Sequence, residues 1–439
     1  MAGRLKERFT KKEWSWIMYD WANSVYATNV SAAIFPILYA QIAGEGTTGA
    51  LVYGYAVSVA NLLIAVMAPY LGSIADFKGM KKKLWFGFML AGVVFTAVMG
   101  VVGSWQMMLL GFVISRIGFS GSCLFYDSFL PEVTTNERMN RVSTWGYAMG
   151  YIGGSTIPFV ISILIIFLMD MSELSMRIGI LIVPVWWLVF SIPFMRNVKQ
   201  EHFVETPPNE LGRAAWHNTV MTFKSILKNK AVLFFLAAYF FYIDGVDTII
   251  SLATNYGSTL GLGTIEMILA LVVTQVVAVP CSILFGKWSK KIGALKLIAA
   301  SVAMYALITI VGFIMGFLVD FHGNFGLEEA QAIRISTVLF WVLATLVGTV
   351  QGGIQALSRS YFGKLIPAER SNEFFGFFDV FGKFAAVVGP LLYSLGYMIS
   401  GRASVGILSL ILLFVCGACL LIFGGKKIAE TERIARSAE

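Results

Sequence analysis

Long apolar runs alternate with short polar segments along the whole chain. A bilayer core about 30 Å thick needs about 20 helical residues to cross it, and twelve runs satisfy this length. The runs lie at residues 15–42, 51–76, 84–103, 105–128, 142–169, 177–195, 231–256, 266–288, 294–319, 334–358, 373–399 and 404–424. Most are too long and too apolar for barrel strands, so helices are the expected spanning structure. The pattern predicts an all-α membrane protein with twelve transmembrane helices.

The longest polar stretch, residues 196–230, divides these runs into six and six. It contains Pro207, Pro208 and six Lys or Arg residues. We therefore expect an N-terminal six-helix bundle at residues 1–195, a cytoplasmic connector at 196–230 and a C-terminal six-helix bundle at 231–439.

The two halves repeat one another at corresponding places. GSIADFKGMKKK after the second run matches GKWSKKIGALKL after the eighth, and the Pro, Asn and Glu of PEVTTNE (131–137) recur 236 residues later. YDWANS in the first run faces IDGVDT in the seventh. Three such matches indicate duplication. They predict two pseudo-symmetric bundles related by an axis along the membrane normal, with a substrate site near the midplane.

Basic residues predict the orientation. Of the 33 Lys and Arg residues, 27 fall on one side of the predicted spans and three on the other, which places both termini and the connector in the cytoplasm. Trp14, Trp16 and Trp21 fit an interfacial aromatic belt. With 57% hydrophobic and 13% charged residues, the chain is unlike a soluble protein. Its net charge of +8 belongs to these loops and does not indicate nucleic-acid binding.

Several enzyme classes are excluded by missing motifs. The sequence has no phosphate-binding G-x-x-x-x-G-K-[ST] loop, no nucleophile–base constellation and no Cys/His spacing typical of a metal site. The four Cys residues all fall within apolar runs, so they are expected to pack rather than form disulfides. We expect no catalytic residue, no metal and no cofactor.

Particular motifs resemble a known family. Gly72, Asp76, Gly79, Lys81 and Lys82 form a G-x-x-x-D-x-x-G-x-K-K string that resembles the loop motif of the major facilitator superfamily. YDWANS, FYDSFLPEV, QALSRSYFGKLIP and EFFGFFDVFGK resemble its vacuole-effluxer-like branch, which includes autophagy-related vacuolar amino-acid permeases. The resemblance covers nearly the whole chain, and it implies a transporter with an amino-acid-like substrate.

Other readings stay open. YDWANS and PYLGSIAD also resemble cation-coupled sugar and glycoside symporters, but the second run carries Asn61 where those proteins carry acidic cation ligands. A lipid flippase is a further alternative. A membrane scaffold without transport would not need carboxylates within its spans.

Ionisable and polar side chains within the spans are the candidate functional residues, because burying them in a bilayer is costly. Each has a structural alternative, as a helix cap, an interhelical hydrogen bond or an internal ion pair. The expected substrate-binding residues are Asn23, Arg116, Asp247, Gln351, Gln355 and Lys383. The expected coupling or gating residues are Asp20, Asp76, Asp127, Asp244, Arg359 and Asp379.

These residues predict a secondary transporter for a small polar organic solute. Arg116 and Lys383 suit a carboxylate, and Asp244 and Asp247 suit an ammonium group; the same residues could instead pair with one another and leave a neutral solute. We expect alternating access, proton coupling, and a monomer in a bacterial plasma membrane that contacts lipids, protons and its solute.

Overall fold

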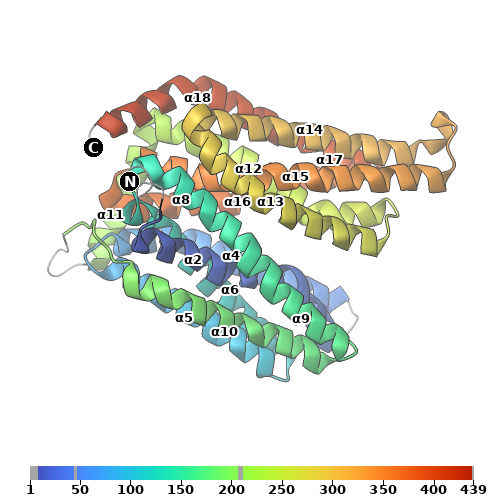
Figure 1. Ribbon diagram of the computed structural model, residues 1–439, viewed down its shortest axis with the longest axis horizontal. Coiled ribbons are helices and arrows are strands. Elements are labelled where there is room, and N and C mark those ends of the chain that lie inside the picture. The colour runs from blue at the N-terminus through green and yellow to red at the C-terminus, as the bar shows by residue number, and fades with distance from the viewer. Residues whose placement is uncertain (1–7, 44–46, 206–210, 438–439) are drawn as a thin grey trace. The chain divides into compact units, whose positions relative to one another are not determined.

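The computed structural model describes residues 8–43, 47–205 and 211–437, so residues 1–7 of the N-terminal arm and 206–210 of the connector lie outside it. Within the described part, twelve helical stretches are long and apolar enough to cross a membrane (Figure 1). They fall on the twelve predicted runs. The all-α, twelve-span prediction is therefore confirmed.

The helices of the first half begin at α2 (Lys11–Val25) and end at α10. The series continues with η1 (Tyr26–Ala33), α3 (Ile34–Ala43), α4 (Thr47–Ala75), α5 (Met80–Val101), α6 (Trp105–Ser128), α7 (Leu130–Val133), α8 (Asn136–Met149), η2 (Gly150–Thr156), α9 (Ile157–Leu168) and α10 (Glu173–Asn197). Side chains fix several starts: Thr10 and Glu13 form a capping box at α2, and Ser172 accepts from the backbone N–H of Ser175 at α10.

The second half follows the connector helix α11 (Leu211–Lys228). Its elements are α12 (Lys230–Thr259), α13 (Thr264–Ile292), α14 (Ala294–Asp320), η3 (His322–Phe325), α15 (Glu329–Leu365), η4 (Ala368–Arg370), α16 (Ser371–Ser400), α17 (Ala403–Ser409) and α18 (Ile411–Ser437). Asn229 caps α12 by accepting from the backbone N–H groups of Ala231 and Val232.

Helix pairings repeat between the halves. In the first half α2 packs against α10, α5 against α6 and α4 against α6; in the second, α12 packs against α18, α14 against α15 and α13 against α15. These are the same positions in each series of six spans. The repeated pairing is the three-dimensional counterpart of the sequence repeat.

Two spans contain π-helical segments, η1 in the first span and η2 in the fifth. Both belong to the first half, and η2 packs against α2. Glycine permits this approach, because a Cβ at Gly154 would overlap the side chain of Ser24 and one at Gly153 would overlap the ring of Trp21. The small residues of span five therefore allow it to pack closely against the first span.

By compactness the chain divides into two units. Unit 1 contains residues 1–224 and 366–380, and unit 2 contains 225–365 and 381–439. The start of α16 thus packs with the first half of the chain, while the rest of α16 packs with the second. The division expected from sequence, at 195 and 231, stays a prediction.

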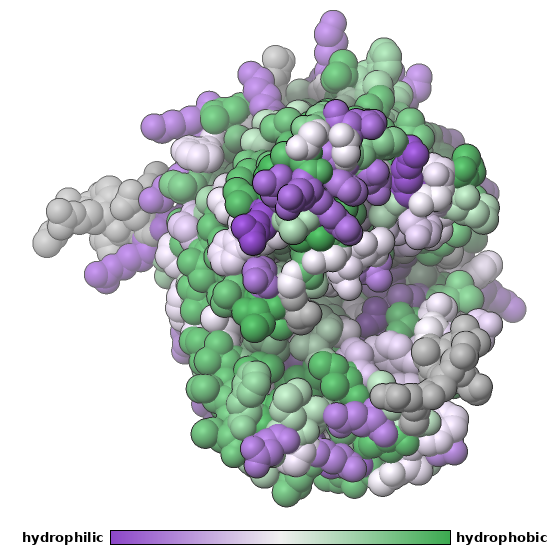
Figure 2. Space-filling model, turned by 90° about the vertical axis from the view of Figure 1, so that its right-hand side faces the viewer, coloured by the Kyte–Doolittle hydropathy of each residue, from purple (hydrophilic) through white to green (hydrophobic). Residues whose placement is uncertain are grey.

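Surface hydropathy agrees with membrane spans. Figure 2 looks onto the helix ends at the right of Figure 1, where hydrophilic patches lie among hydrophobic surface. Many large apolar side chains are exposed, among them Leu168, Ile399 and Phe423 at 83%, 83% and 76%. Trp16, by contrast, is fully buried and donates to the backbone oxygen of Tyr126 at 2.9 Å, so the prediction that it joins an interfacial belt is wrong.

Candidate functional site

Arg116 lies within unit 1 on α6 and is half-buried. Its Nε donates to Oδ1 of Asn61 at 3.0 Å, and its Nη1 donates to Oγ of Ser31 at 3.3 Å. Its guanidinium carbon lies 5.9 Å from the centre of the Phe112 ring. Among the described residues Arg116 has no carboxylate partner. A guanidinium has five N–H donors, so most of them stay available to an anionic ligand.

The π segment η1 carries polar side chains toward neighbouring spans. The Tyr26 hydroxyl lies 2.8 Å from that of Ser115 on α6, and Asn29 Nδ2 donates to Oγ of Ser162 on α9 at 2.8 Å. Ser31, the partner of Arg116, also belongs to η1. Sequence reasoning missed Tyr26 and Asn29 as polar contacts. A π segment often marks a functional site.

The first span holds Asp20 and Asn23 on α2. Oδ2 of Asp20 accepts from the Tyr126 hydroxyl at 2.8 Å, and Asp127, the next residue on α6, is half-buried. Asn23 is 4% exposed, and its Nδ2 has no acceptor among the described residues. A buried donor without a partner is costly, which makes Asn23 suited to a ligand.

A cluster of buried polar residues closes the predicted cytoplasmic end of unit 1. Both carboxylate oxygens of Asp76 accept hydrogen bonds from the start of α16: the backbone N–H of Asn372 at 3.0 Å, its Nδ2 at 2.6 Å and the backbone N–H of Glu373 at 3.0 Å. Asp76 therefore caps the α16 N-terminus from the turn that follows α4, an arrangement that the helix dipole favours. A Cβ at Gly72 would overlap the carbonyl oxygen of Asn372, so this glycine permits the approach.

Lys81 is fully buried beside Asp76. Its Nζ donates to Glu132 at 2.8 Å, to the Ser128 carbonyl at 3.0 Å and to the Ser371 hydroxyl at 3.0 Å. We name Asp76, Lys81, Glu132, Ser371 and Asn372 the loop cluster. The carboxylate of Glu132 and two neutral oxygens replace the water that would surround an exposed lysine.

Two carboxyl groups of the loop cluster have shifted pKa values. Burial raises the pKa of Asp76 to about 7, against the opposing charge of Lys81. Burial also acts to raise the pKa of Glu132, but the charge and hydrogen bond of Lys81 and the backbone N–H groups of Glu201 and His202 outweigh it and hold that pKa below its usual range. Glu132 is thus a fixed anion, whereas Asp76 titrates near neutrality.

Unit 2 contains two carboxylates one turn apart on α12. Asp244 is fully buried, and its Oδ1 accepts from the backbone N–H of Gly389 at 2.9 Å and from the Thr248 hydroxyl at 3.3 Å. Oδ2 of Asp244 has no partner among the described residues. Asp247 is half-buried and, in the same part of the chain, has no ion pair. We name Asp244 and Asp247 the acidic pair.

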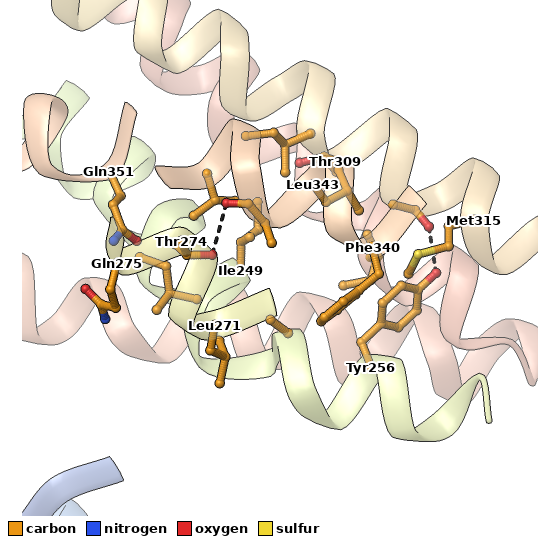
Figure 3. Close-up of a pocket in the computed structure, with 17 residues that line it drawn as sticks. Ile249, Tyr256, Leu271, Thr274, Gln275, Thr309, Met315, Phe340, Leu343 and Gln351 are labelled. Carbon is orange, nitrogen blue, oxygen red and sulfur yellow. Dashed lines mark hydrogen bonds between the residues drawn. The ribbon is translucent and has the colours of Figure 1, made fainter. Parts of the chain in front are cut away.

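A cavity of about 110 Å³ lies inside unit 2, between α12, α13, α14, α15 and α17 (Figure 3). Its wall is mostly apolar, with Ile249, Phe340 and Leu343 among its residues. Gln351 and Gln275 lie at one end. Gln351 is 5% exposed and Oε1 of Gln275 has no donor among the described residues, so both amides can serve a ligand.

The remaining predicted site residues lie on α15 and α16. Gln355 is half-buried one turn beyond Gln351 and does not line the cavity. Arg359 is 3% exposed, and α15 continues to Leu365, so Arg359 belongs to the helix body rather than to a loop. Asp379 and Lys383 are half-buried on successive turns of α16.

The chain is similar to known transporters over most of its length. The family described as "Vacuole effluxer Atg22 like" matches residues 47–427. The chain is 41% identical to the "Uncharacterized MFS-type transporter YxiO" of Bacillus subtilis, over 95% of this chain and 96% of the relative. It is 31% identical to the "Autophagy-related protein 22" of Yarrowia lipolytica, over 58% of this chain and 45% of that protein.

Solved structures support the same fold. A proton:xylose symporter of the major facilitator superfamily, XylE, superposes with a TM-score of 0.68 at 11% identity, covering 94% of each chain. A bacterial homologue of the iron transporter ferroportin in an outward-facing state gives 0.65 at 13% identity, covering 95% of this chain and 98% of the other. At these identities the likeness concerns the fold alone.

Proposed function

The chain belongs to the Atg22-like vacuole effluxer family of major-facilitator transporters, and from that premise we propose that it moves a small, polar, amino-acid-like solute across the membrane by alternating access, coupled to protons. Its relatives are named as transporters rather than enzymes. The 27-to-3 distribution of Lys and Arg supports a cytoplasmic position for both termini and the connector.

The acidic pair carries the proposal of proton coupling. Two carboxylates one turn apart on a helix repel each other, and the described residues provide neither with a cation. A proton or a cationic group that reaches the pair removes this repulsion. Ionisable groups within spans commonly mark proton and substrate pathways.

Protonation of Asp244 has a structural consequence. A neutral carboxyl group accepts more weakly than a carboxylate, so protonation weakens the bond from the Gly389 N–H that joins α16 to α12. A Cβ at Gly389 would lie 2.8 Å from Oδ1 of Asp244, so the two helices are in direct contact here. We infer that proton binding releases α16 from α12, which couples the proton to movement.

Arg116 is the proposed anchor for a substrate carboxylate. It is half-buried, it has no acidic partner among the described residues, and Asn61 and Ser31 hold it by neutral oxygens. Because Asn61 stands in span two and its oxygen accepts from Arg116, the acidic cation ligand of the sugar symporters is lacking there, which favours the amino-acid-like substrate over the cation-coupled sugar alternative. Asn23, Asp247, Gln351, Gln355 and Lys383 are the further proposed substrate contacts.

We propose that gating depends on contacts near the predicted cytoplasmic ends of the spans. Asp76 joins the start of α16 to the end of α4 through hydrogen bonds, so these bonds must break before the two helix ends can separate. Asp20, Asp127, Arg359 and Asp379 are the other proposed coupling or gating residues.

The test is uptake by proteoliposomes that contain the purified full-length protein, screened with amino acids, peptides and sugars. We expect amino acids to exchange, and we expect Arg116→Gln to abolish exchange of carboxylate-bearing solutes while Arg116→Lys retains part of it. Exchange of sugars alone, or full activity of Arg116→Gln, would contradict the proposed substrate class.

Orientation is tested separately. An impermeant thiol reagent should fail to reach a cysteine introduced by Asn209→Cys in intact cells and should reach it after the cells are opened. Asn209 lies in the predicted connector, outside the described residues. Labelling of this cysteine from outside intact cells would contradict the predicted topology.

A further inference from the structure

Helix α11 carries an exposed apolar stripe. At about 100° per residue, Trp216, Val220, Phe223 and Leu227 share one face of the helix. Trp216, Phe223 and Leu227 are 63%, 47% and 51% exposed. A second, buried face of the helix holds Ala215 and Ile226, which are 0% and 2% exposed. The helix therefore has two apolar faces. Among the described residues one face is buried, and the other is largely exposed apart from a contact between Phe223 and Phe377.

A basic stripe borders the exposed apolar stripe on the side away from the buried face. It consists of Arg213, His217, Lys224 and Lys228, all exposed. The helix contains no Asp or Glu. An apolar face flanked by basic residues, with a Trp among the apolar ones, is typical of a helix that lies in the interface of an anionic membrane.

Contacts of α11 with the spans lie near the predicted cytoplasmic ends of α4 and α16, including a hydrogen bond from Thr222 to Glu373 at 2.7 Å. The Thr219 hydroxyl donates to the backbone oxygen of Pro69 at 3.4 Å, and Pro69 precedes the end of α4 at Ala75 by six residues. At 1.5 Å per residue this is about 9 Å inside the end of that helix. The Phe223 ring stacks on Phe377, with ring centres 5.8 Å apart, six residues inside the start of α16.

The direction of α11 also fits a surface helix. A Cβ at Gly212 would lie 3.3 Å from the Tyr70 hydroxyl, next to Pro69, the contact of Thr219. On α16, a Cβ at Gly376 would lie 2.8 Å from the Cα of Pro69, and Gly376 precedes Phe377, the contact of Phe223. Thr219 and Phe223 of α11 therefore contact α4 and α16 at the same level.

We propose that α11 is an interfacial helix that binds the anionic cytoplasmic leaflet, with its apolar stripe at the acyl boundary and its basic stripe at the lipid phosphates. The occupant is lipid rather than an acidic protein because the exposed stripe lies below the end of the spans, where lipid surrounds the protein. The inference rests on the proposed orientation of the connector. In this arrangement α11 attaches the connector between the two halves of the chain to the membrane surface.

The first test measures where each face of α11 lies. The full-length protein, carrying Cys123→Ala, Cys281→Ala, Cys416→Ala and Cys419→Ala, receives either Leu227→Cys on the apolar stripe or Ser225→Cys on the opposite side as a matched exposed control. A fluorophore on each cysteine is then quenched in nanodiscs by nitroxide lipids or by aqueous iodide. We expect lipid quenching to be several-fold stronger at position 227 and iodide quenching to be stronger at 225.

The second test measures the charge preference. With the label at position 227, nitroxide phosphatidylglycerol should quench more than nitroxide phosphatidylcholine, and Lys224→Gln with Lys228→Gln should lower that ratio toward one, because each lysine adds attraction to the anionic headgroups. The matched control, Lys290→Gln with Lys291→Gln, should leave the ratio unchanged.

Equal iodide access at positions 225 and 227, or cross-linking of Leu227→Cys between copies without lipid quenching, would overturn the proposal. Nanodiscs expose both membrane faces, and neither measurement requires transport. A wrong orientation or a wrong substrate is therefore detected by the labelling and uptake experiments and leaves these results unaffected.

Discussion

Lys81 and Asp244 are both fully buried, yet their surroundings differ. Lys81 has three oxygen acceptors, one of them the carboxylate of Glu132. Asp244 has two neutral donors, one oxygen without a partner and a second carboxylate, Asp247, one turn away. Breaking a buried ion pair is strongly destabilising, because it leaves one charge without its partner. Two carboxylates that no cation neutralises can instead bind a proton or a cationic ligand. The ion pair of Lys81 and Glu132 therefore holds structure, and the acidic pair is the candidate for proton coupling.

The largest effect is expected from Lys81→Met. This change leaves Glu132 as an unpaired buried anion, so the free energy of unfolding should fall by about 3–5 kcal/mol. Lys81→Met with Glu132→Gln should recover part of the loss. The matched control is Lys83→Gln, an exposed neighbour, which should change stability by no more than about 0.5 kcal/mol. Denaturant unfolding of the purified protein measures each value.

Neutralising a residue of the acidic pair should affect the free energy of unfolding much less than Lys81→Met. Asp244→Asn leaves a weaker, neutral acceptor for Gly389 and removes a charge that no described cation balances, so the two effects oppose each other and stability should change by no more than about 1 kcal/mol. A loss comparable to that of Lys81→Met in the same unfolding assay would show that Asp244 has a structural partner, and the contrast between the two regions would fail.

Asp76 should make the loop cluster sensitive to pH. Its folded pKa of about 7 lies above the unfolded value of 3.8, so the folded state retains the proton to higher pH. The resulting stability is present below about pH 4 and is lost as the pH rises through 7. The unfolding midpoint of the wild type should therefore fall more between pH 5.5 and 8 than that of Asp76→Asn. Parallel curves would contradict this assignment.

Two glycines provide a smaller but sharper contrast. Gly72→Ala would place a methyl group on the backbone carbonyl of Asn372, so stability should fall by about 1–3 kcal/mol. Gly389→Ala would meet the side chains of Thr248 and Asp244, which can rotate, so transport should suffer more than stability. Gly87→Ala, with open space around it, is the control. Equal stability losses at Gly72 and Gly389 would remove the distinction.

The architecture could be predicted from sequence because it depends on local patterns. Span length, the repeat and the resemblance each lie in contiguous residues, and all twelve spans appear where expected. Asp76 could be recognised from sequence as part of a loop motif, and in the structure it caps α16. That Asp76 binds Asn372 could not be predicted from sequence, because 296 residues separate the two.

Other features left no readable signal. Lys81 belongs to a run of three lysines that is typical of a solvated turn, and its burial depends on Glu132, 51 residues away. Nothing in the sequence of η1, YATNVSAA, indicates a π segment, so Ser31 could not be assigned to Arg116. Gln351 was predicted as a substrate contact, but its place at the end of an apolar cavity depends on four other helices. The sequence shows which residues are polar. It does not show which residues, distant along the chain, provide their hydrogen bonds and opposite charges.

The central claim is that the acidic pair couples transport to protons, and one measurement tests it most directly. Proteoliposomes with wild-type protein or with Asp244→Asn and Asp247→Asn together are given an imposed pH gradient, and flux of the exchanged solute is followed. The wild type should accelerate or concentrate its solute with the gradient, and the double variant should still exchange solute but ignore the gradient. A double variant that responds to the gradient as the wild type does would contradict the account.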